Sequence, residues 1–127
     1  MKEDHQNPDY TYITGRLDKM LVPSLLYFLS QRPSHGYELI QKFNDSGFSE
    51  VEADPATIYR NLRRMEEDGL VISKWETDQS GPARRAYVLT PEGEQALAYC
   101  VELINDKVGK LNAFLDEYNR RIKGGRE

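Results

Sequence analysis

Five arginines of this 127-residue chain occupy two short segments, and their side chains could recognise phosphate groups or guanine bases. Arg60, Arg63 and Arg64 fall within five positions, and Arg84 and Arg85 are adjacent. A guanidinium group presents its N–H donors as a planar fork, which matches phosphate oxygens and the O6/N7 edge of guanine. With three nearby polar residues they form a predicted surface for double-stranded DNA: Thr57, Tyr59, Arg60, Arg63, Arg64, Lys74, Arg84 and Arg85.

Other kinds of chemistry have few candidate residues. Cys100 is the single cysteine, and His5 and His35 are the two histidines, so we expect no disulfide and no metal site. The chain also lacks a nucleophile elbow and a glycine-rich phosphate-binding loop. We therefore expect a protein that is not an enzyme and holds no cofactor.

The same observations place the chain in the cell. A lone cysteine fits the reducing cytoplasm, so we expect a cytoplasmic, nucleoid-associated protein. No apolar run approaches the ~20 residues that a membrane span needs, so we expect no membrane partner.

The charge balance does not by itself indicate DNA binding. The formal net charge is −4, whereas DNA-binding domains are usually basic. Residues 55–90 carry six Lys/Arg against five Asp/Glu, while residues 1–54 and 91–127 are both acidic on balance. The acidic total keeps a second interpretation open, in which the chain binds a protein partner and no DNA.

Residues 54–68 show the start and stop signals of a short helix. Asp54 is a typical N-cap, Pro55 suits the first helical position, and Gly69 suits a left-handed C-terminal cap that Leu70 completes by touching Met65. Three apolar residues at helical spacing predict a buried face, namely Ile58, Leu62 and Met65. The three arginines of this helix are therefore expected to point outward.

These side chains also have structural interpretations. Arg63 could pair with Glu67 and Arg64 with Asp68, because residues four apart are neighbours on a helix surface. Such exposed pairs are weak, yet they would neutralise part of the positive charge. Tyr59 is equally compatible with a half-buried position that pins the helix.

Two further helices are predicted before this one. Pro23 and Pro33 bound a helix over residues 24–31, since proline suits a first helical turn and stops a helix that reaches it. Ser34 is the expected cap of a second helix, which ends near residues 44–47.

A β-hairpin is predicted after the arginine-bearing helix. Residues 70–76 and 84–89 are β-prone, and the segment 77–83 between them is rich in turn residues. Adjacent strand residues point to opposite faces, so we expect at least one of Arg84 and Arg85 to reach DNA. Trp75 is expected to anchor the hairpin against the core.

A long helix is predicted from Thr90-Pro91 to Ile122. Its apolar residues recur at alternating spacings of four and three, which is the coiled-coil pattern. This seam consists of Leu97, Val101, Ile104, Val108, Leu111, Leu115, Tyr118 and Ile122. A helix of this length projects beyond so small a domain, so we expect a homodimer along the seam; the alternative is packing within one protomer. Gly109 would allow a kink or a close helix approach.

Several segments resemble the PadR family of bacterial transcriptional regulators. The motifs are His35-Gly-Tyr-Glu-Leu39, Asp54-Pro-Ala-Thr-Ile-Tyr-Arg-Asn-Leu62, Glu67-Asp-Gly-Leu-Val71 and Gly81-Pro-Ala-Arg-Arg-Ala-Tyr-Val-Leu-Thr-Pro-Glu-Gly93. The resemblance covers roughly residues 15–93, and the long helix stands where the family has its dimerisation helix. It implies a homodimeric winged-helix repressor, with Tyr59, Arg60 and Arg63 in the recognition helix and Arg84 and Arg85 in the wing.

Two details refine the resemblance and one departs from it. The run of residues 81–85 looks most like the branch of polyhydroxybutyrate-responsive repressors, and the single C-terminal helix looks like the short subfamily. Many relatives have glycine where this chain has Ala56, a difference that leaves the helix intact.

Together the patterns predict a mainly α-helical fold with a small β-hairpin, as a winged helix-turn-helix with a long C-terminal dimerisation helix. The expected segments are a flexible arm (1–13), the DNA-binding domain (14–90), the dimerisation helix (91–122) and a frayed tail (123–127). The expected function is sequence-specific binding of a near-palindromic operator, with release by a small-molecule or metabolic signal. The alternative is a winged-helix module that binds a protein.

An effector pocket would need apolar groups beside the long helices. Tyr99, Leu103 and Phe114 lie off the seam and are candidates for binding a small hydrophobic or aromatic effector, with core packing as the alternative role. His35 and Tyr37 are expected to pack together at a helix start, and Cys100 is expected to be a small buried residue.

Overall fold

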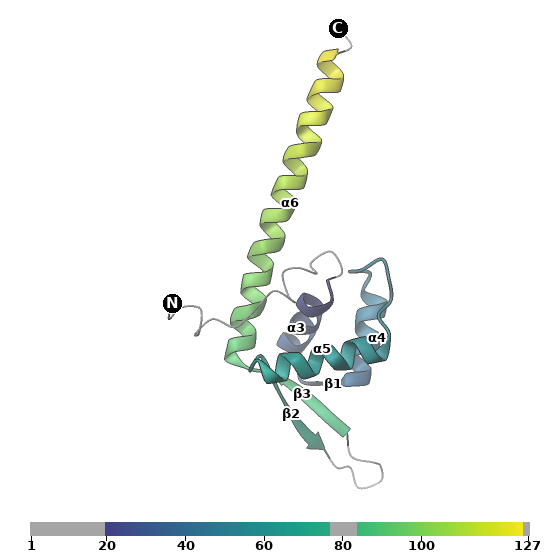
Figure 1. Cartoon of the computed structure of the whole chain (residues 1–127), viewed down its shortest axis with the longest axis vertical. Coiled ribbons are helices and arrows are strands. Elements are labelled where there is room, and N and C mark those ends of the chain that lie inside the picture. The colour runs from purple at the N-terminus through teal and green to yellow at the C-terminus, as the bar shows by residue number, and fades with distance from the viewer. Residues whose placement is uncertain (1–19, 77–83, 126–127) are drawn as a thin grey trace.

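The computed structural model describes residues 20–76 and 84–125. Figure 1 shows a small helical domain with a β-hairpin at one end and a long helix that projects from it. The elements are α3 (Leu21–Gln31), β1 (Ser34–His35), α4 (Gly36–Ser46), α5 (Pro55–Glu67), β2 (Val71–Glu76), β3 (Arg84–Leu89) and α6 (Pro91–Gly125). This order confirms the predicted winged helix-turn-helix and long C-terminal helix. The expected arm, the hairpin turn at 77–83 and the end of the tail lie outside the described residues.

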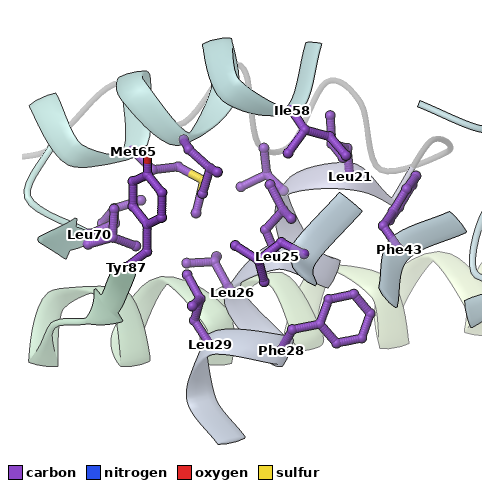
Figure 2. Packing of buried hydrophobic residues seen from close by; sticks show 14 of the residues in the cluster. Leu21, Leu25, Leu26, Phe28, Leu29, Phe43, Ile58, Met65, Leu70 and Tyr87 are labelled. Carbon is purple, nitrogen blue, oxygen red and sulfur yellow. The ribbon is translucent and has the colours of Figure 1, made fainter. Parts of the chain in front are cut away.

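One hydrophobic core joins the three short helices, the sheet and the base of α6. Leu25, Leu26, Ile58 and Met65 are fully buried, and Figure 2 shows these side chains gathered between α3 and α5. The helix predicted over residues 24–31 begins three residues earlier, at Leu21, so Pro23 still lies in its first turn. The core thus holds α5 in a fixed position on α3.

Helix α5 has the predicted boundaries. Asp54 Oδ1 accepts the backbone N–H of Thr57 at 2.9 Å, and this contact with Thr57 lowers the pKa of Asp54. At the other end Gly69 has φ +80°, and Leu70 N–H donates to the Met65 carbonyl at 2.9 Å. Leu70 and Met65 are both fully buried in the same cluster, which agrees with the contact predicted for this C-terminal cap.

The start of α4 differs from the prediction. Ser34 does not cap this helix; it pairs with Tyr87 of β3 as part of the two-residue strand β1. The N-cap is His35, whose backbone N–H donates to Glu38 Oε1 at 2.7 Å. The sequence did not indicate β1, because two residues cannot show strand alternation and the partner strand lies about fifty positions further along the chain.

The sheet has three antiparallel strands in the order β1-β3-β2. Residues of β2 and β3 pair from Val71↔Leu89 to Glu76↔Arg84, which confirms the hairpin. Trp75 was expected to anchor the hairpin against the core. This prediction is wrong, because Trp75 is 67% exposed. It lies opposite Arg85, and the guanidinium carbon sits 5.8 Å from the centroid of its ring.

Helix α6 is attached firmly at its base. Thr90 Oγ1 accepts Gly93 N–H at 3.0 Å and donates to the Gly69 carbonyl at 2.6 Å, which ties the helix start to the end of α5. Ala96 and Cys100 are buried in the core, as expected for Cys100. The helix continues through Gly109 to Gly125 as a single element, beyond the predicted end at Ile122, so residues 123–125 are helical and do not belong to a frayed tail. Within the described residues, none of the helices combines the length and the apolar character that crossing a membrane requires.

Candidate nucleic-acid interface

Helix α5 separates its apolar and basic side chains onto different faces. Ile58, Leu62 and Met65 are fully buried, whereas Arg60 and Arg63 are exposed. This arrangement confirms that the arginines point away from the core. The separation follows from the 3.6-residue helical period and from the core that α3 provides on one side only.

The three arginines of α5 have different neighbours. Arg60 Nη2 donates to Thr57 Oγ1 at 3.4 Å, and the Arg60 charge helps to lower the pKa of Asp54 after the larger effect of the hydrogen bonds from Thr57. Arg64 Nε lies 3.4 Å from Asp68 Oδ2, so one of the two predicted helix pairs forms. Arg63 forms no ion pair with any residue of the described ranges 20–76 and 84–125. Within the described residues its guanidinium group thus has no carboxylate partner to lose on binding a ligand.

Tyr59 has a structural role in addition to its place on this surface. Tyr59 is 41% exposed, which does not support the half-buried position that the sequence allowed as an alternative. The ring lies against Gly36 at the start of α4, where an added Cβ would come within 2.4 Å of Tyr59 Cε1. Glycine at this point leaves room for the Tyr59 ring, which a larger residue would displace.

Arg84 and Arg85 point to opposite faces of the sheet, as predicted. Arg84 Nη1 donates to the Tyr37 hydroxyl at 2.9 Å and lies above the Tyr37 ring. Tyr37 in turn stacks on His35 with ring centroids 5.6 Å apart, which confirms the predicted packing pair. The His35 ring reaches Glu76 of β2 through Nε2 at 2.9 Å. The start of α4 is thereby connected to the hairpin.

Lys74 shares the sheet face of Arg84. It lies opposite Ala86 in the register, and Ala86 is two residues from Arg84, so the three side chains project on the same side. Lys74 and Arg84 are both exposed, which leaves two positive charges on the outer face of the hairpin.

Arg85 lies on the other face, where it contacts α5. Its Nη2 is 3.1 Å from Glu66 Oε1, and its Nε donates to Ser73 Oγ at 2.9 Å. Glu66 was not among the residues predicted from the sequence to belong to this surface. The one sequence feature that could have indicated Glu66 is its position beside the arginines of α5. Its partner Arg85 is nineteen residues away, so the sequence does not show that the two side chains meet.

The seam of α6 is exposed over most of its length. Leu97 packs against the core and Ile104 is half-buried, but the other six seam residues are exposed, with exposed fractions between 37% and 53%: Val101, Val108, Leu111, Leu115, Tyr118 and Ile122. The alternative in which the seam packs within one protomer is therefore wrong beyond Ile104. An exposed apolar stripe of this regularity is typical of a helix with a partner.

The structure does not bring the three effector candidates together. Tyr99 and Phe114 are exposed, so core packing does not explain either side chain, and Leu103 is half-buried. Fifteen residues separate Tyr99 from Phe114 along α6, a distance of about 22 Å at the helical rise. The two side chains therefore lie far apart on α6 within one protomer.

The described part of the chain contains no group of three or more His, Cys, Asp or Glu side chains that could hold a metal ion. Burial raises the pKa of the Cys100 thiol to about 11, so this residue stays protonated at neutral pH.

Comparisons with known proteins agree with this geometry. Transcriptional regulator Rv3488 of Mycobacterium tuberculosis is 36% identical over 73 residues, which are 58% of this chain and 64% of that protein. A PadR-like transcriptional regulator from Bacillus cereus has a TM-score of 0.65 at 30% identity, over 76% of this chain and 91% of that chain. The crystal structure of Bacillus subtilis PadR in complex with operator DNA shares the fold, with a TM-score of 0.59 at 20% identity over 65% of this chain and 46% of that chain.

A whole protein family also matches the central part of the chain. Residues 25–99, more than half of the sequence, match the transcriptional regulator PadR-like family. This match confirms the resemblance that the motifs carried, and the chain belongs to the transcriptional regulator PadR-like family.

Proposed function

We propose that this protein binds double-stranded DNA as a homodimer and represses transcription by covering a near-palindromic operator. The observation that carries the proposal is the division of α5 into a buried apolar face and an exposed face with Arg60 and Arg63. An α-helix fits the major groove, where guanine presents the O6 and N7 acceptors that arginine binds in a bidentate manner. Helix α5 would thus be the recognition helix.

The hairpin supports a second contact beside the groove. Lys74 and Arg84 project from the outer face of β2 and β3, which are the strands of a wing in this fold. Positive side chains on a wing suit the phosphate backbone or the adjacent minor groove. Thr57, Tyr59 and Arg64 of α5 would add contacts to the phosphates that flank the bases.

The exposed stripe of α6 supports the dimer. A two-fold dimer would place two copies of α5 about one DNA turn apart, ~34 Å, so the operator would have two related half-sites. The relatives are transcriptional regulators, and the Bacillus subtilis PadR structure contains operator DNA. This chain spans 64% of the length of the curated Mycobacterium tuberculosis relative.

The proposal is tested with a labelled duplex from the promoter region of the protein's own gene. We expect retention that weakens steeply with salt, because each phosphate contact adds about −0.9 to the slope of log affinity against log salt. The double variant Arg60→Ala, Arg63→Ala should lose at least tenfold in affinity at a fixed salt concentration.

The matched control is Arg120→Ala, Arg121→Ala, which removes the same charge near the C-terminal end of α6, far from α5 (Figure 1). It should bind like the wild type. Equal losses in both double variants would show that charge alone matters and would contradict a specific role for α5. A wild-type protein with no salt-sensitive retention would favour the protein-binding alternative.

A further inference from the structure

We infer that Glu66 and Arg85 are positioning residues that hold the β2–β3 hairpin against α5, and that Arg85 does not itself bind DNA. The inference rests on the proposed function. It concerns a set of contacts that joins α5, β2 and β3 on the inner face of the hairpin.

Three hydrogen bonds close a triangle between the three elements. Arg85 Nη2 donates to Glu66 Oε1 at 3.1 Å, and Arg85 Nε donates to Ser73 Oγ at 2.9 Å. The Ser73 hydroxyl then donates to the second Glu66 oxygen, Oε2, at 2.7 Å. Both carboxylate oxygens of Glu66 are thus occupied, and each bond links the hairpin to α5 or one strand to the other.

Two aromatic rings fix the guanidinium group further. The Arg85 guanidinium carbon lies 5.8 Å from the ring centroid of Trp75 and 5.8 Å from that of Tyr87. Trp75 is the direct partner of Arg85 in the register, and Tyr87 is two residues further along β3 on the same face. Cation–π contacts on this scale favour one orientation of the guanidinium group.

These surroundings distinguish Arg85 from Arg63 and Arg84. Arg63 has no ion pair with a residue of the described segments, and Arg84 lies on the outer face beside Lys74. Arg85 would have to give up the carboxylate of Glu66 to reach a phosphate. Its pair with Glu66 is also partly exposed, so it contributes little to the free energy of unfolding. Setting the orientation of the hairpin is the role that these contacts fit.

The sign of one substitution separates positioning from simple electrostatics. Glu66→Gln removes a negative charge from a surface that faces DNA, so by charge alone it should tighten binding. If Glu66 positions the hairpin, the same substitution should weaken binding, because Lys74 and Arg84 lose their alignment with the backbone. We expect at least a threefold loss of affinity for the operator duplex.

Glu67→Gln is the matched control. It makes the same change of charge one residue further along α5, where the exposed Glu67 has no role in the triangle. This control should bind as tightly as the wild type or more tightly. Arg85→Lys keeps the charge but loses the planar fork, so it should weaken binding about as much as Glu66→Gln, and the double variant should be no worse than either.

A second measurement does not depend on DNA. Trp75 is the single tryptophan of the chain, so its fluorescence reports the surroundings of Arg85. Glu66→Gln and Arg85→Lys should both make Trp75 more accessible to quenching by acrylamide, a neutral molecule, and Glu67→Gln should not.

The outcomes are distinct. Additive losses for Glu66→Gln and Arg85→Lys, or equal tightening by Glu66→Gln and Glu67→Gln, would overturn the inference. Unchanged quenching in both triangle variants would overturn it as well. A wild-type protein that binds no DNA would instead overturn the proposed function, even where the quenching of Trp75 changes as expected.

Discussion

At the scale of residues, chemically identical side chains differ in what they can do because their neighbours differ. Arg63 is exposed and has no ion pair in the described ranges, whereas Arg85 is bonded to Glu66 and Ser73. The first guanidinium group can bind a phosphate or a guanine without breaking an ion pair to any described residue, and the second cannot. Sequence position alone does not separate the two, since both belong to basic segments.

Cys100 shows the same dependence on surroundings. It is fully buried, and burial raises the pKa of its thiol to about 11 from an ordinary value of 9.0. Because the thiolate is the reactive form, we expect the native protein at pH 8 to react with iodoacetamide far more slowly than the unfolded protein. The reaction is followed by mass, and the single cysteine gives a single rate.

The raised pKa also gives the sign of a pH effect. The contribution of Cys100 to stability is fully present below the unfolded pKa of 9.0 and is lost as the pH rises toward 11.

Native labelling at the rate of a free thiol would contradict the burial of this side chain. The same reaction in denaturant is the control.

At the scale of elements, one close contact fixes the start of α6. A Cβ added at Gly93 would lie 2.2 Å from the Leu70 carbonyl oxygen and 2.5 Å from Leu89 Cδ1. We expect Gly93→Ala to lower the free energy of unfolding by about 1–3 kcal/mol, because helix and backbone must move apart. Urea denaturation followed by circular dichroism measures this change.

Gly109→Ala is the control in the same helix. Nothing lies within 4 Å of a Cβ at this position, so the substitution should raise stability by roughly 1 kcal/mol through helix propensity. The two variants should therefore shift the urea midpoint in opposite directions. A shift of the same sign and size in both would show that Gly93 has no special contact.

The elements that the sequence predicted well are those with local signals. The boundaries of α5 follow from Asp54, Pro55 and Gly69, which act within a few residues of the helix ends. Strand β1 and the role of Glu66 were not predictable, because each depends on a partner that only the fold brings near. The prediction that Trp75 packs against the core failed for the same reason. The ring contacts Arg85 on the surface of the hairpin, and the sequence does not show this contact.

At the scale of the whole molecule, α6 is the unusual feature. It has 35 residues, which corresponds to a length of about 52 Å, and only its base is packed on the domain. Beyond Ile104 its apolar stripe contacts water in one protomer. A stripe that repeats every 3.5 residues continues to face a partner helix along its length, which agrees with the proposed dimer.

The dimer is tested by placing a charge in this stripe. Leu111→Asp should weaken dimerisation at least tenfold, because a two-fold interface would bury one unpaired carboxylate from each protomer. Ala113→Asp adds the same charge two residues further along, on the side of α6 away from the stripe, and should leave dimerisation unchanged. Sedimentation velocity over a range of protein concentrations measures both.

The same pair of variants links assembly to function. If both half-sites must be bound together, Leu111→Asp should lose affinity for a duplex with two half-sites but bind a single half-site as the wild type does. Ala113→Asp should bind both duplexes normally. A Leu111→Asp protein that stays dimeric at the concentrations where the wild type is dimeric would show that the stripe is not the interface, and the contact that joins two copies would then lie elsewhere on the domain.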